Sequence, residues 1–324
     1  MFMETRKIVV LDAYSLCLDK PETLIEVLPK SGEVVVYDRT SPDQVIARSA
    51  EADFIFTNKT VIDELAINSL PRLKMIGVLA TGYNVVDVEA AKRRGIIVAN
   101  VPAYSTESVA QMAFAHILNI TQQVGHYSRD IRCGSWDSQP DFSYRDTPLV
   151  ELSGKTIGLV GFGNTGQATA RLALAFGMKV KVFTSKSQDR LPVGVTKATL
   201  DEVFSTCDIV SLHCPLTAQN AKMVNAQRLA MMKPNAIFIN TARGGLVDEY
   251  ALAEALKNHK IWAAGLDVLS QEPPKCDCPL LKLDNCYITP HIAWATSEAI
   301  ERLIKVTGDN ASSAAEGKPV NNVW

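Results

Sequence analysis

Residues Lys155 to Thr184, KTIGLVGFGNTGQATARLALAFGMKVKVFT, contain the pattern that decides the fold of this chain. The apolar run before the glycines predicts a buried parallel strand, and the run at the end of the stretch predicts a second one. Between them, Gly161, Gly163 and Gly166 allow a tight turn, a close approach of backbone and close packing of helix on strand. An alanine- and leucine-rich helix follows, and Gly177 can end it.

A helix that begins directly after such a turn suits a pyrophosphate. Its first N–H groups have no partner in the helix, and they lie at the positive end of the helix dipole. GxGxxG alone is weak evidence, but its place between strand and helix in one unit makes it strong. We therefore predict a dinucleotide site; the alternatives are a purely structural turn and another nucleotide-like ligand such as S-adenosylmethionine.

Length and composition narrow the function classes. A chain of 324 residues predicts two domains. The net charge of -2 gives no electrostatic reason to expect nucleic acid or an anionic membrane as a partner. The first residues, MFMETRK, lack the apolar core of a signal peptide, so we expect a cytoplasmic location. The 7 cysteines are odd in number and scattered, which predicts reduced thiols, and no Cys/His pairs at zinc spacing suggest a metal site.

The rest of the chain alternates apolar runs with helix-like stretches, which predicts parallel sheets with helices on both faces. The first part should contain strands at Ile8–Leu11, Val34–Tyr37, Phe54–Phe56, Met75–Leu79 and Ile96–Ala99, and helices at Pro21–Leu28, Pro42–Ser49, Val61–Leu65 and Val86–Arg93. The later part should contain strands at Ile209–Pro215, Ala236–Asn240, Trp262–Leu266 and Tyr287–Thr289, and a closing helix from Ser297 to about Ser313.

The stretch from Thr106 to Val124 predicts one long helix, capped by Ser105 or Thr106 and apolar nearly all round. His116 and His126, on or just after it, are interpreted as packing or capping residues. Residues 128–148 are polar and aromatic without periodicity, and loops of this length are usually functional or interfacial. We expect an arm that packs on a second subunit.

Three polar residues at or just beyond strand ends, Arg243, Glu272 and His291, suggest the chemistry. An arginine fork grips a carboxylate and polarises the adjacent carbonyl. A histidine can exchange a proton with the forming alkoxide, and a carboxylate can orient its ring. With a hydride from a nicotinamide, this set suits a 2-oxo or 2-hydroxy acid. The alternative for Arg243 is a turn cap, that for Glu272 is a solvated loop carboxylate, and that for His291 is a buried packing histidine.

Over nearly its whole length the chain resembles the D-isomer-specific 2-hydroxyacid dehydrogenases. The matching blocks are Gly158–Gly166, Cys207–Thr217, Asn240–Asp248, Gly265–Val268 and Thr289–Thr296. The resemblance implies that Arg243 binds substrate, Glu272 supports the histidine and His291 is the acid/base. It also implies a Rossmann domain at 101–293, inserted into a flavodoxin-like substrate domain at 1–100 and 294–324, and a homodimer formed through the nucleotide domain.

The resemblance implies two further sets of contacts. The implied cofactor contacts are Thr106, Gly161, Gly163, Asn164, Thr165, Gly166, Thr184, Ser185, Lys186, Cys214, Pro215, Thr241, Ala242, Arg243, Asp267 and His291. Within that set, Asp267 would hold the nicotinamide carboxamide. The implied substrate contacts are Ala80, Thr81, Gly82, Arg243, His291 and Trp294, of which Thr81 and Gly82 would offer backbone N–H groups to the carboxylate.

Within the family, the segment Asn100–Gln111 and Trp294 are similar to those of glycerate dehydrogenases (hydroxypyruvate reductases). The expected pair is therefore hydroxypyruvate and D-glycerate, with glyoxylate as a further substrate; D-lactate-type and phosphoglycerate-type substrates are alternatives. Formate dehydrogenases of this fold place Gln where this chain has Glu272, which argues against a formate or phosphite activity. A nucleotide-sensing scaffold like the C-terminal-binding-protein corepressors keeps similar residues and is the non-enzymatic alternative.

The chain departs from the family at the end of the second Rossmann strand. Members that use NAD place Asp there to accept hydrogen bonds from the ribose hydroxyls. Here the position is Thr184, followed by Ser185 and Lys186. Without the carboxylate nothing repels a 2′-phosphate, and Lys186 can attract one. We predict that NADPH is accepted at least as well as NADH; the alternative is a solvated polar turn that tolerates NAD through other contacts.

Overall fold

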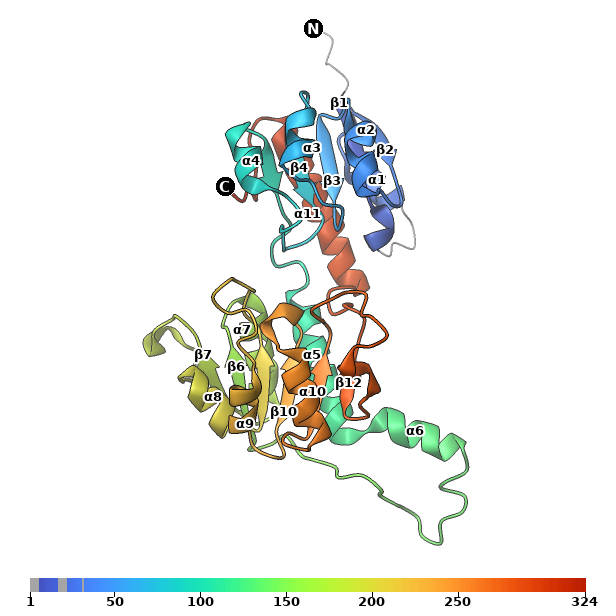
Figure 1. Ribbon diagram of the computed structural model, residues 1–324, viewed down its shortest axis with the longest axis vertical. Helices are drawn as coiled ribbons and strands as arrows, with labels where there is room; N and C mark the ends of the chain where they lie inside the picture. The colour runs from blue at the N-terminus through green and yellow to red at the C-terminus, as the bar shows by residue number, and fades with distance from the viewer. Residues whose placement is uncertain (1–5, 17–21, 31) are drawn as a thin grey trace. The chain divides into compact units, whose positions relative to one another are not determined.

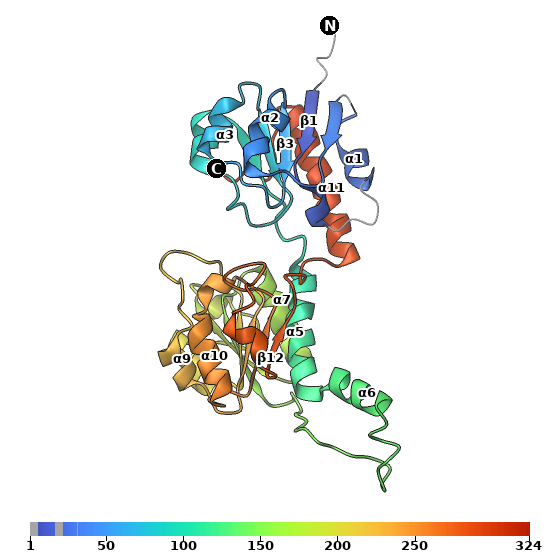
Figure 2. The same cartoon turned by 45° about the vertical axis from the view of Figure 1, so that its right-hand side comes forward.

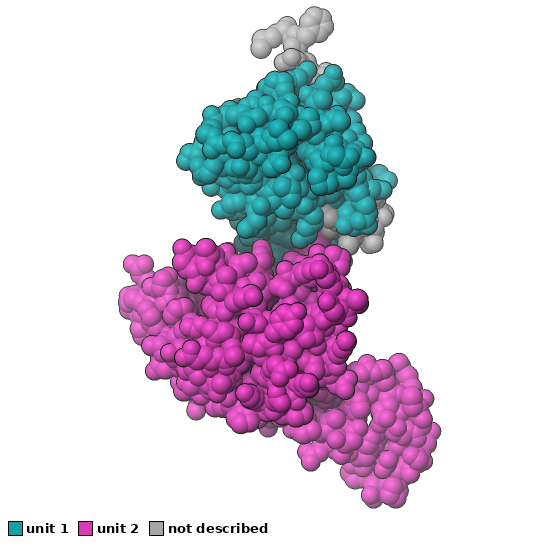
Figure 3. Space-filling view, in the orientation of Figure 1, with its two compact units in different colours: residues 1–105, 295–324 teal, residues 106–294 magenta. Residues whose placement is uncertain are grey.

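The computed structural model describes residues 6–16, 22–30 and 32–324. The chain divides into two compact units: Met1–Ser105 with Ala295–Trp324 form unit 1, and Thr106–Trp294 form unit 2 (Figure 3). Unit 2 is thus inserted between the two chain ends that make unit 1. The boundaries expected from the sequence, after residues 100 and 293, lie close to these. Cys17 and Pro21 lie outside the described residues.

Unit 1 contains a parallel sheet of 5 strands in the order β2-β1-β3-β4-β5 (Figure 1). Its strands are β1 Arg6–Val10, β2 Gly32–Val36, β3 Phe54–Thr57, β4 Met75–Val78 and β5 Ile97–Ala99. Its helices are α1 Glu22–Val27, α2 Val45–Ser49, α3 Glu64–Ser69, α4 Val88–Arg93 and α11 Ser297–Ala315. The strand order is that of the flavodoxin-like sheets. Helix α11, from the end of the chain, packs against α1 and β4.

Two helices of unit 1 begin later than the sequence predicts. The predicted bounds Val61–Leu65 are wrong, since α3 runs from Glu64 to Ser69 and begins after the N-cap Asp63. Likewise α4 begins after its N-cap Asp87. Ile62 and Val86 pair with each other in a parallel bridge, so the residues before each cap are extended. In each case the cap carboxylate accepts a hydrogen bond from the backbone N–H at N3, which fixes the start of the helix.

Unit 2 contains a parallel sheet of 7 strands in the order β12-β11-β10-β9-β6-β7-β8. Its strands are β6 Thr156–Val160, β7 Lys179–Phe183, β8 Val195–Lys197, β9 Ile209–Leu212, β10 Ile237–Asn240, β11 Ala263–Leu266 and β12 Cys286–Ile288. Its helices are α5 Thr106–Gln122, α6 Val124–Arg132, α7 Asn164–Ala175, α8 Leu200–Thr206, α9 Ala226–Met231 and α10 Glu249–Lys257. The predicted α/β class with two parallel sheets is confirmed.

Strand β6 lies between β7 and β9, where the strand order reverses. Ligands of open parallel sheets bind at this reversal, beyond the carboxyl ends of the strands. One buried cluster packs side chains of α8, α9 and α10 on the sheet, and another packs α5 and α7 on it. Strands β9, β10 and β11 are buried along their whole length, as expected for a sheet covered on both faces.

The predicted helix from Thr106 to Val124 ends at Gln122, because Gln123 adopts a left-handed conformation with φ of 51°. Helix α6 then begins, so the segment expected to be irregular is partly helical. Figure 2 shows α6 and the loop that follows it extending from the body of unit 2. Within the described residues, no helix has the length and apolarity that crossing a membrane requires.

Candidate active site

The site residues predicted in unit 2 follow the carboxyl ends of neighbouring strands. Gly161 follows β6, Thr184 follows β7, Cys214 follows β9, Thr241 follows β10, Asp267 follows β11 and His291 follows β12. Since the carboxyl ends of parallel strands meet at one edge of a sheet, these residues lie along that edge. Thr106 begins α5, and it is half-buried.

The glycine turn has the properties that the sequence predicts. Gly161 has φ of +103°, and a Cβ added there would lie 2.5 Å from the carbonyl oxygen of His213. A Cβ added at Gly166 would lie 2.4 Å from the carbonyl oxygen of Gly161. Gly163, by contrast, has open space around it and caps α7 with no side-chain hydrogen bond. Backbone N–H groups at the start of α7 are therefore accessible to an anionic group, as pyrophosphate requires.

A pocket of about 780 Å³ lies at this turn. The predicted cofactor residues that line it are Gly161, Gly163, Thr184, Ser185, Lys186 and Cys214. The other wall of the pocket consists of Leu200, the segment 219–223, Asn225 and Arg228. The sequence does not indicate these residues as ligand contacts. The charged lining residues are Lys186, Lys222 and Arg228, all cationic, so the pocket favours an anionic ligand. The other predicted cofactor contacts are not part of this lining: Thr106, Asn164, Thr165, Gly166, Pro215, Thr241, Ala242, Arg243, Asp267 and His291.

Two other features of the predicted cofactor residues concern the turn after β7 and Thr241. Thr184 accepts a hydrogen bond from the backbone N–H of Lys186 at 3.2 Å, which shapes the turn after β7. The Nζ of Lys186 lies 5.4 Å from the centre of the Phe162 ring. Among the described residues, the buried hydroxyl of Thr241 has no hydrogen-bond partner, although Thr241 is only 8% exposed. An orphaned buried hydroxyl at a predicted cofactor contact is consistent with a bound polar ligand.

His291 and Glu272 are brought together by the fold. The Nδ1 of His291 donates a hydrogen bond of 2.6 Å to Oε2 of Glu272. The other oxygen of Glu272 accepts the backbone N–H of Leu269 at 2.9 Å, so the carboxylate is oriented from both sides. The imidazole is half-buried, and with Nδ1 engaged its Nε2 is the nitrogen left for a reacting group.

The loop of Arg243 abuts the loop of Glu272. The side chain of Asn240, 1% exposed, accepts the N–H of Ala242 and donates to the carbonyl of Arg243, both at 3.0 Å. A Cβ on Gly244 would lie 1.9 Å from the carbonyl carbon of Leu269, so the two loops touch through their backbones. The guanidinium of Arg243 is exposed and bonds the carbonyl of Ala242 at 2.7 Å through one nitrogen. A cation, an imidazole and a carboxylate thus share one edge of unit 2.

Asp267 is 1% exposed, and its carboxylate is bonded to the segment that carries His291. Its predicted contact with a nicotinamide carboxamide stays a prediction. Trp294 donates from its indole nitrogen to the carbonyl of His291 at 2.8 Å. Both residues therefore support the His291 turn, a role that the sequence reasoning missed.

His213 is a different kind of histidine. It is buried and lies 2.9 Å from the hydroxyl of Ser211. Burial lowers its pKa to about 4, so it is neutral near pH 7 and lacks the acidic proton of an imidazolium. His259 is exposed, as predicted, and His126 pairs with Asp146 at 2.8 Å.

The remaining predicted substrate contacts belong to unit 1. Thr81 and Gly82 follow β4, and their N–H groups donate no hydrogen bond within the described residues. The carbonyl of Thr81 accepts the side chain of Asn100 at 2.7 Å, and that of Ala80 accepts the N–H of Val101 at 3.0 Å. This loop thus has a defined shape and two open donors, which suits a small anion. No cluster of metal-ligating residues occurs in the described parts of the chain.

Comparison with known proteins identifies the family of this chain. Residues 114–293 match the family described as the NAD-binding domain of D-isomer specific 2-hydroxyacid dehydrogenases. The chain is 44% identical to the hydroxypyruvate reductase of Blautia hydrogenotrophica over 98% of this chain and 99% of that protein. It is 37% identical to the glycerate dehydrogenase of Methylorubrum extorquens, with the same shares covered.

A solved structure resembles both units. It is the NADPH-dependent glyoxylate/hydroxypyruvate reductase of Sinorhizobium meliloti in complex with NADP and malonate, 31% identical with a TM-score of 0.84. The match covers 98% of this chain and 97% of that one, so the likeness is not confined to the nucleotide-binding unit.

Proposed function

Because this chain belongs to the D-isomer specific 2-hydroxyacid dehydrogenases, which are nicotinamide-dependent oxidoreductases, we propose that it reduces hydroxypyruvate to D-glycerate. Glyoxylate is the second proposed substrate. The observation that carries the proposal is the 2.6 Å hydrogen bond between His291 and Glu272, beside the loop of Arg243. The names of the relatives, a hydroxypyruvate reductase and a glycerate dehydrogenase, support this choice of substrate.

The proposed mechanism assigns a separate task to each side chain. Arg243 binds the substrate carboxylate and draws electron density from the neighbouring carbonyl. The Nε2 of protonated His291 gives its proton to the carbonyl oxygen as that oxygen becomes an alkoxide. Glu272 keeps the imidazole aimed by accepting from Nδ1. The start of α7 and the Thr184–Lys186 turn would hold the nicotinamide cofactor, which would supply the hydride.

A spectrophotometric screen tests the function. Hydroxypyruvate, glyoxylate, pyruvate and phosphohydroxypyruvate are each offered with NADH and with NADPH, and cofactor oxidation is followed. We expect the highest kcat/KM for hydroxypyruvate. A higher value for pyruvate would favour the D-lactate-type alternative. Formate is offered separately with the oxidised cofactors, and their reduction would favour the formate-type alternative. No turnover in either direction would favour the scaffold.

We further propose that NADPH serves at least as well as NADH. Three cations line the pocket at Lys186, Lys222 and Arg228, and Thr184 offers no carboxylate to repel a 2′-phosphate. Replacing Thr184 by Asp should shift the ratio of kcat/KM for NADPH over NADH by about tenfold or more toward NADH. Thr184→Ser is the matched control, since it keeps the hydroxyl that accepts from Lys186. A hundredfold NADH preference of the unaltered enzyme would contradict the proposal.

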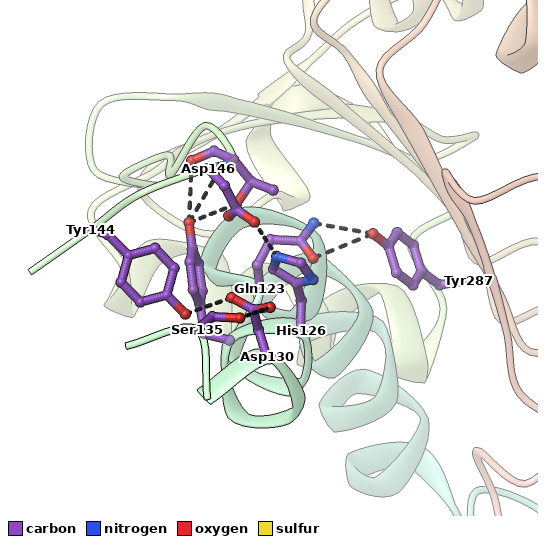
Figure 4. Close-up of polar contacts among 9 residues, drawn as sticks. Gln123, His126, Asp130, Ser135, Tyr144, Asp146 and Tyr287 are labelled. Carbon is purple, nitrogen blue, oxygen red and sulfur yellow. Dashed lines mark hydrogen bonds and ion pairs between the residues drawn. The ribbon is translucent and has the colours of Figure 1, made fainter. Parts of the chain in front are cut away.

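The proposal includes a homodimer formed through unit 2, in which the arm, residues 128–148, packs on the second subunit. Figure 4 shows that polar contacts within the arm give it its own shape. Asp130 accepts hydrogen bonds from the hydroxyls of Ser135 and Tyr144, each at 2.6 Å. The bond from Tyr144 raises the pKa of that tyrosine to about 12. Gln123 ties the base of the arm to Tyr287 at 3.0 Å. Yet Phe142 remains 91% exposed, as an apolar side chain awaiting a partner would be.

Sedimentation velocity checks the dimer. We expect the unaltered chain to sediment as a dimer and Phe142→Asp to shift it toward monomer. Val193→Asp is the matched control, because Val193 is 97% exposed but lies outside the arm. A monomeric unaltered chain would refute the dimer. The expected cytoplasmic location also stays part of the proposal, and cell fractionation checks it.

A further inference from the structure

One buried carboxylate holds the turn that presents His291. The Oδ1 of Asp267 accepts the hydroxyl of Thr289 at 2.6 Å and the N–H of Ile292 at 3.0 Å. Its Oδ2 accepts the N–H of Ala293 at 2.9 Å. These donors lie on both sides of His291 in the chain. Asp267 therefore clamps the turn from Thr289 to Ala293 across its two ends.

His291 needs such a clamp because its backbone is strained. Its φ of 54° lies in the left-handed region, which is unfavourable for a residue with a Cβ. Residues persist there only where the surrounding structure fixes them. Within the turn, the N–H of His291 bonds the carbonyl of Thr289 at 2.9 Å, and Trp294 bonds the carbonyl of His291. The position of the imidazole thus depends on the hydrogen bonds that define the turn.

The clamp continues to a second histidine on another element. The Nε2 of His116, on α5, lies 3.2 Å from the hydroxyl oxygen of Thr289. The one hydrogen of that hydroxyl goes to Asp267, because a carboxylate can only accept. The oxygen of Thr289 must therefore accept from His116, which fixes the tautomer of His116 with its hydrogen on Nε2. Hydrogen bonds run in one direction, from His116 through Thr289 to Asp267.

His116 is placed firmly enough to serve as the fixed end of this chain of bonds. It is 4% exposed, and a Cβ added at Gly265 of β11 would lie 2.6 Å from its Cβ. Its ring therefore lies against the backbone of the neighbouring strand. Burial lowers the pKa of His116, against the opposite effect of the charge on Asp267, so the ring is a neutral donor.

We propose that His116 and Thr289 are positioning residues: with Asp267 they hold the turn from Thr289 to Ala293 in the conformation that aims His291 at the substrate. Neither touches the reacting atoms, and both act through His291. The kinetic consequence rests on the proposed function, whereas the hydrogen-bond direction does not.

Kinetics of matched variants of Thr289 test the positioning role. Thr289→Val removes the hydroxyl and keeps the shape, and it should lower kcat about tenfold or more. The dissociation constant of NADPH, measured by fluorescence, should stay within about twofold, which excludes gross misfolding. Thr289→Ser restores the hydroxyl and should recover most of kcat. An equal loss of kcat in Thr289→Val and Thr289→Ser would overturn the proposal.

A double-mutant cycle separates positioning from general destabilisation. If Thr289 acts through His291, Thr289→Val should change the residual rate of His291→Ala by less than about twofold. A loss as large as in the unaltered background would overturn the positioning role.

Imidazole ¹H–¹⁵N correlation spectra of the cofactor-free protein provide a readout that needs no turnover. With only 5 histidines, the signals can be assigned by single substitutions such as His116→Gln. We expect His116 to be neutral with its hydrogen on Nε2, and Thr289→Val to shift that signal. A hydrogen on Nδ1 would overturn the inference. If the protein reduces no 2-oxo acid, the proposed function is wrong. The inference about the hydrogen bonds is then tested by the tautomer of His116 alone.

Discussion

Replacing His291 by alanine is expected to lower turnover with hydroxypyruvate by about 10²–10⁴-fold. The substitution removes the only group that the proposed mechanism gives a proton to transfer. It also leaves Glu272 without the imidazole that it now orients at 2.6 Å. Steady-state kinetics at saturating NADPH measure the effect, and an unchanged rate would remove His291 from the acid/base role.

The other histidines of unit 2 provide the controls for this experiment. His213 cannot replace the missing acid, because its pKa of about 4 keeps it neutral at assay pH. His259 is exposed and precedes the amino end of β11, whereas the site lies at the carboxyl ends of the strands, so His259→Ala should leave turnover unchanged. Glu272→Gln keeps a hydrogen-bond acceptor but removes the charge. It should lower turnover less than His291→Ala does, because the imidazole itself is retained.

The sequence was most informative where one local pattern has one physical solution. Gly161 must adopt φ of +103° and let the backbone of His213 approach, and only glycine meets both demands. The GxGxxG pattern between strand and helix therefore located the turn, and the βα alternation then predicted two parallel sheets. Arg243, Glu272 and His291 could be singled out because polar residues just beyond buried strands meet at one edge.

The features that sequence reasoning missed depend on contacts between distant residues. His116 and Thr289 are 173 positions apart, and nothing near His116 indicates that its ring reaches another strand. The sequence therefore indicates only a packing histidine at this position. The far wall of the pocket comes from the start of α8, the loop after β9 and the start of α9, where no periodicity marks a ligand contact. The short edge strand β8, VTK, is too polar to stand out as a strand.

Replacing Arg243 by lysine is expected to raise KM for hydroxypyruvate by about 10- to 100-fold, even though the positive charge is retained. A carboxylate binds a guanidinium through two parallel hydrogen bonds in one plane, and an ammonium group is a point charge that cannot reproduce that fork. One nitrogen of Arg243 also bonds the carbonyl of Ala242 at 2.7 Å, which sets the plane of the fork before substrate arrives. Lysine would have to serve the carbonyl and the carboxylate with one nitrogen.

The same substitution at a surface position tests whether the effect belongs to the site. Arg171 on α7 forms an exposed ion pair with Glu107 at 2.6 Å, and such pairs contribute little, so Arg171→Lys should leave KM unchanged. Kinetic constants of Arg243→Lys equal to those of the unaltered enzyme would count against the carboxylate clamp. A loss confined to kcat would instead mean that the guanidinium acts mainly on the carbonyl in the transition state, because an interaction made only there does not contribute to substrate binding.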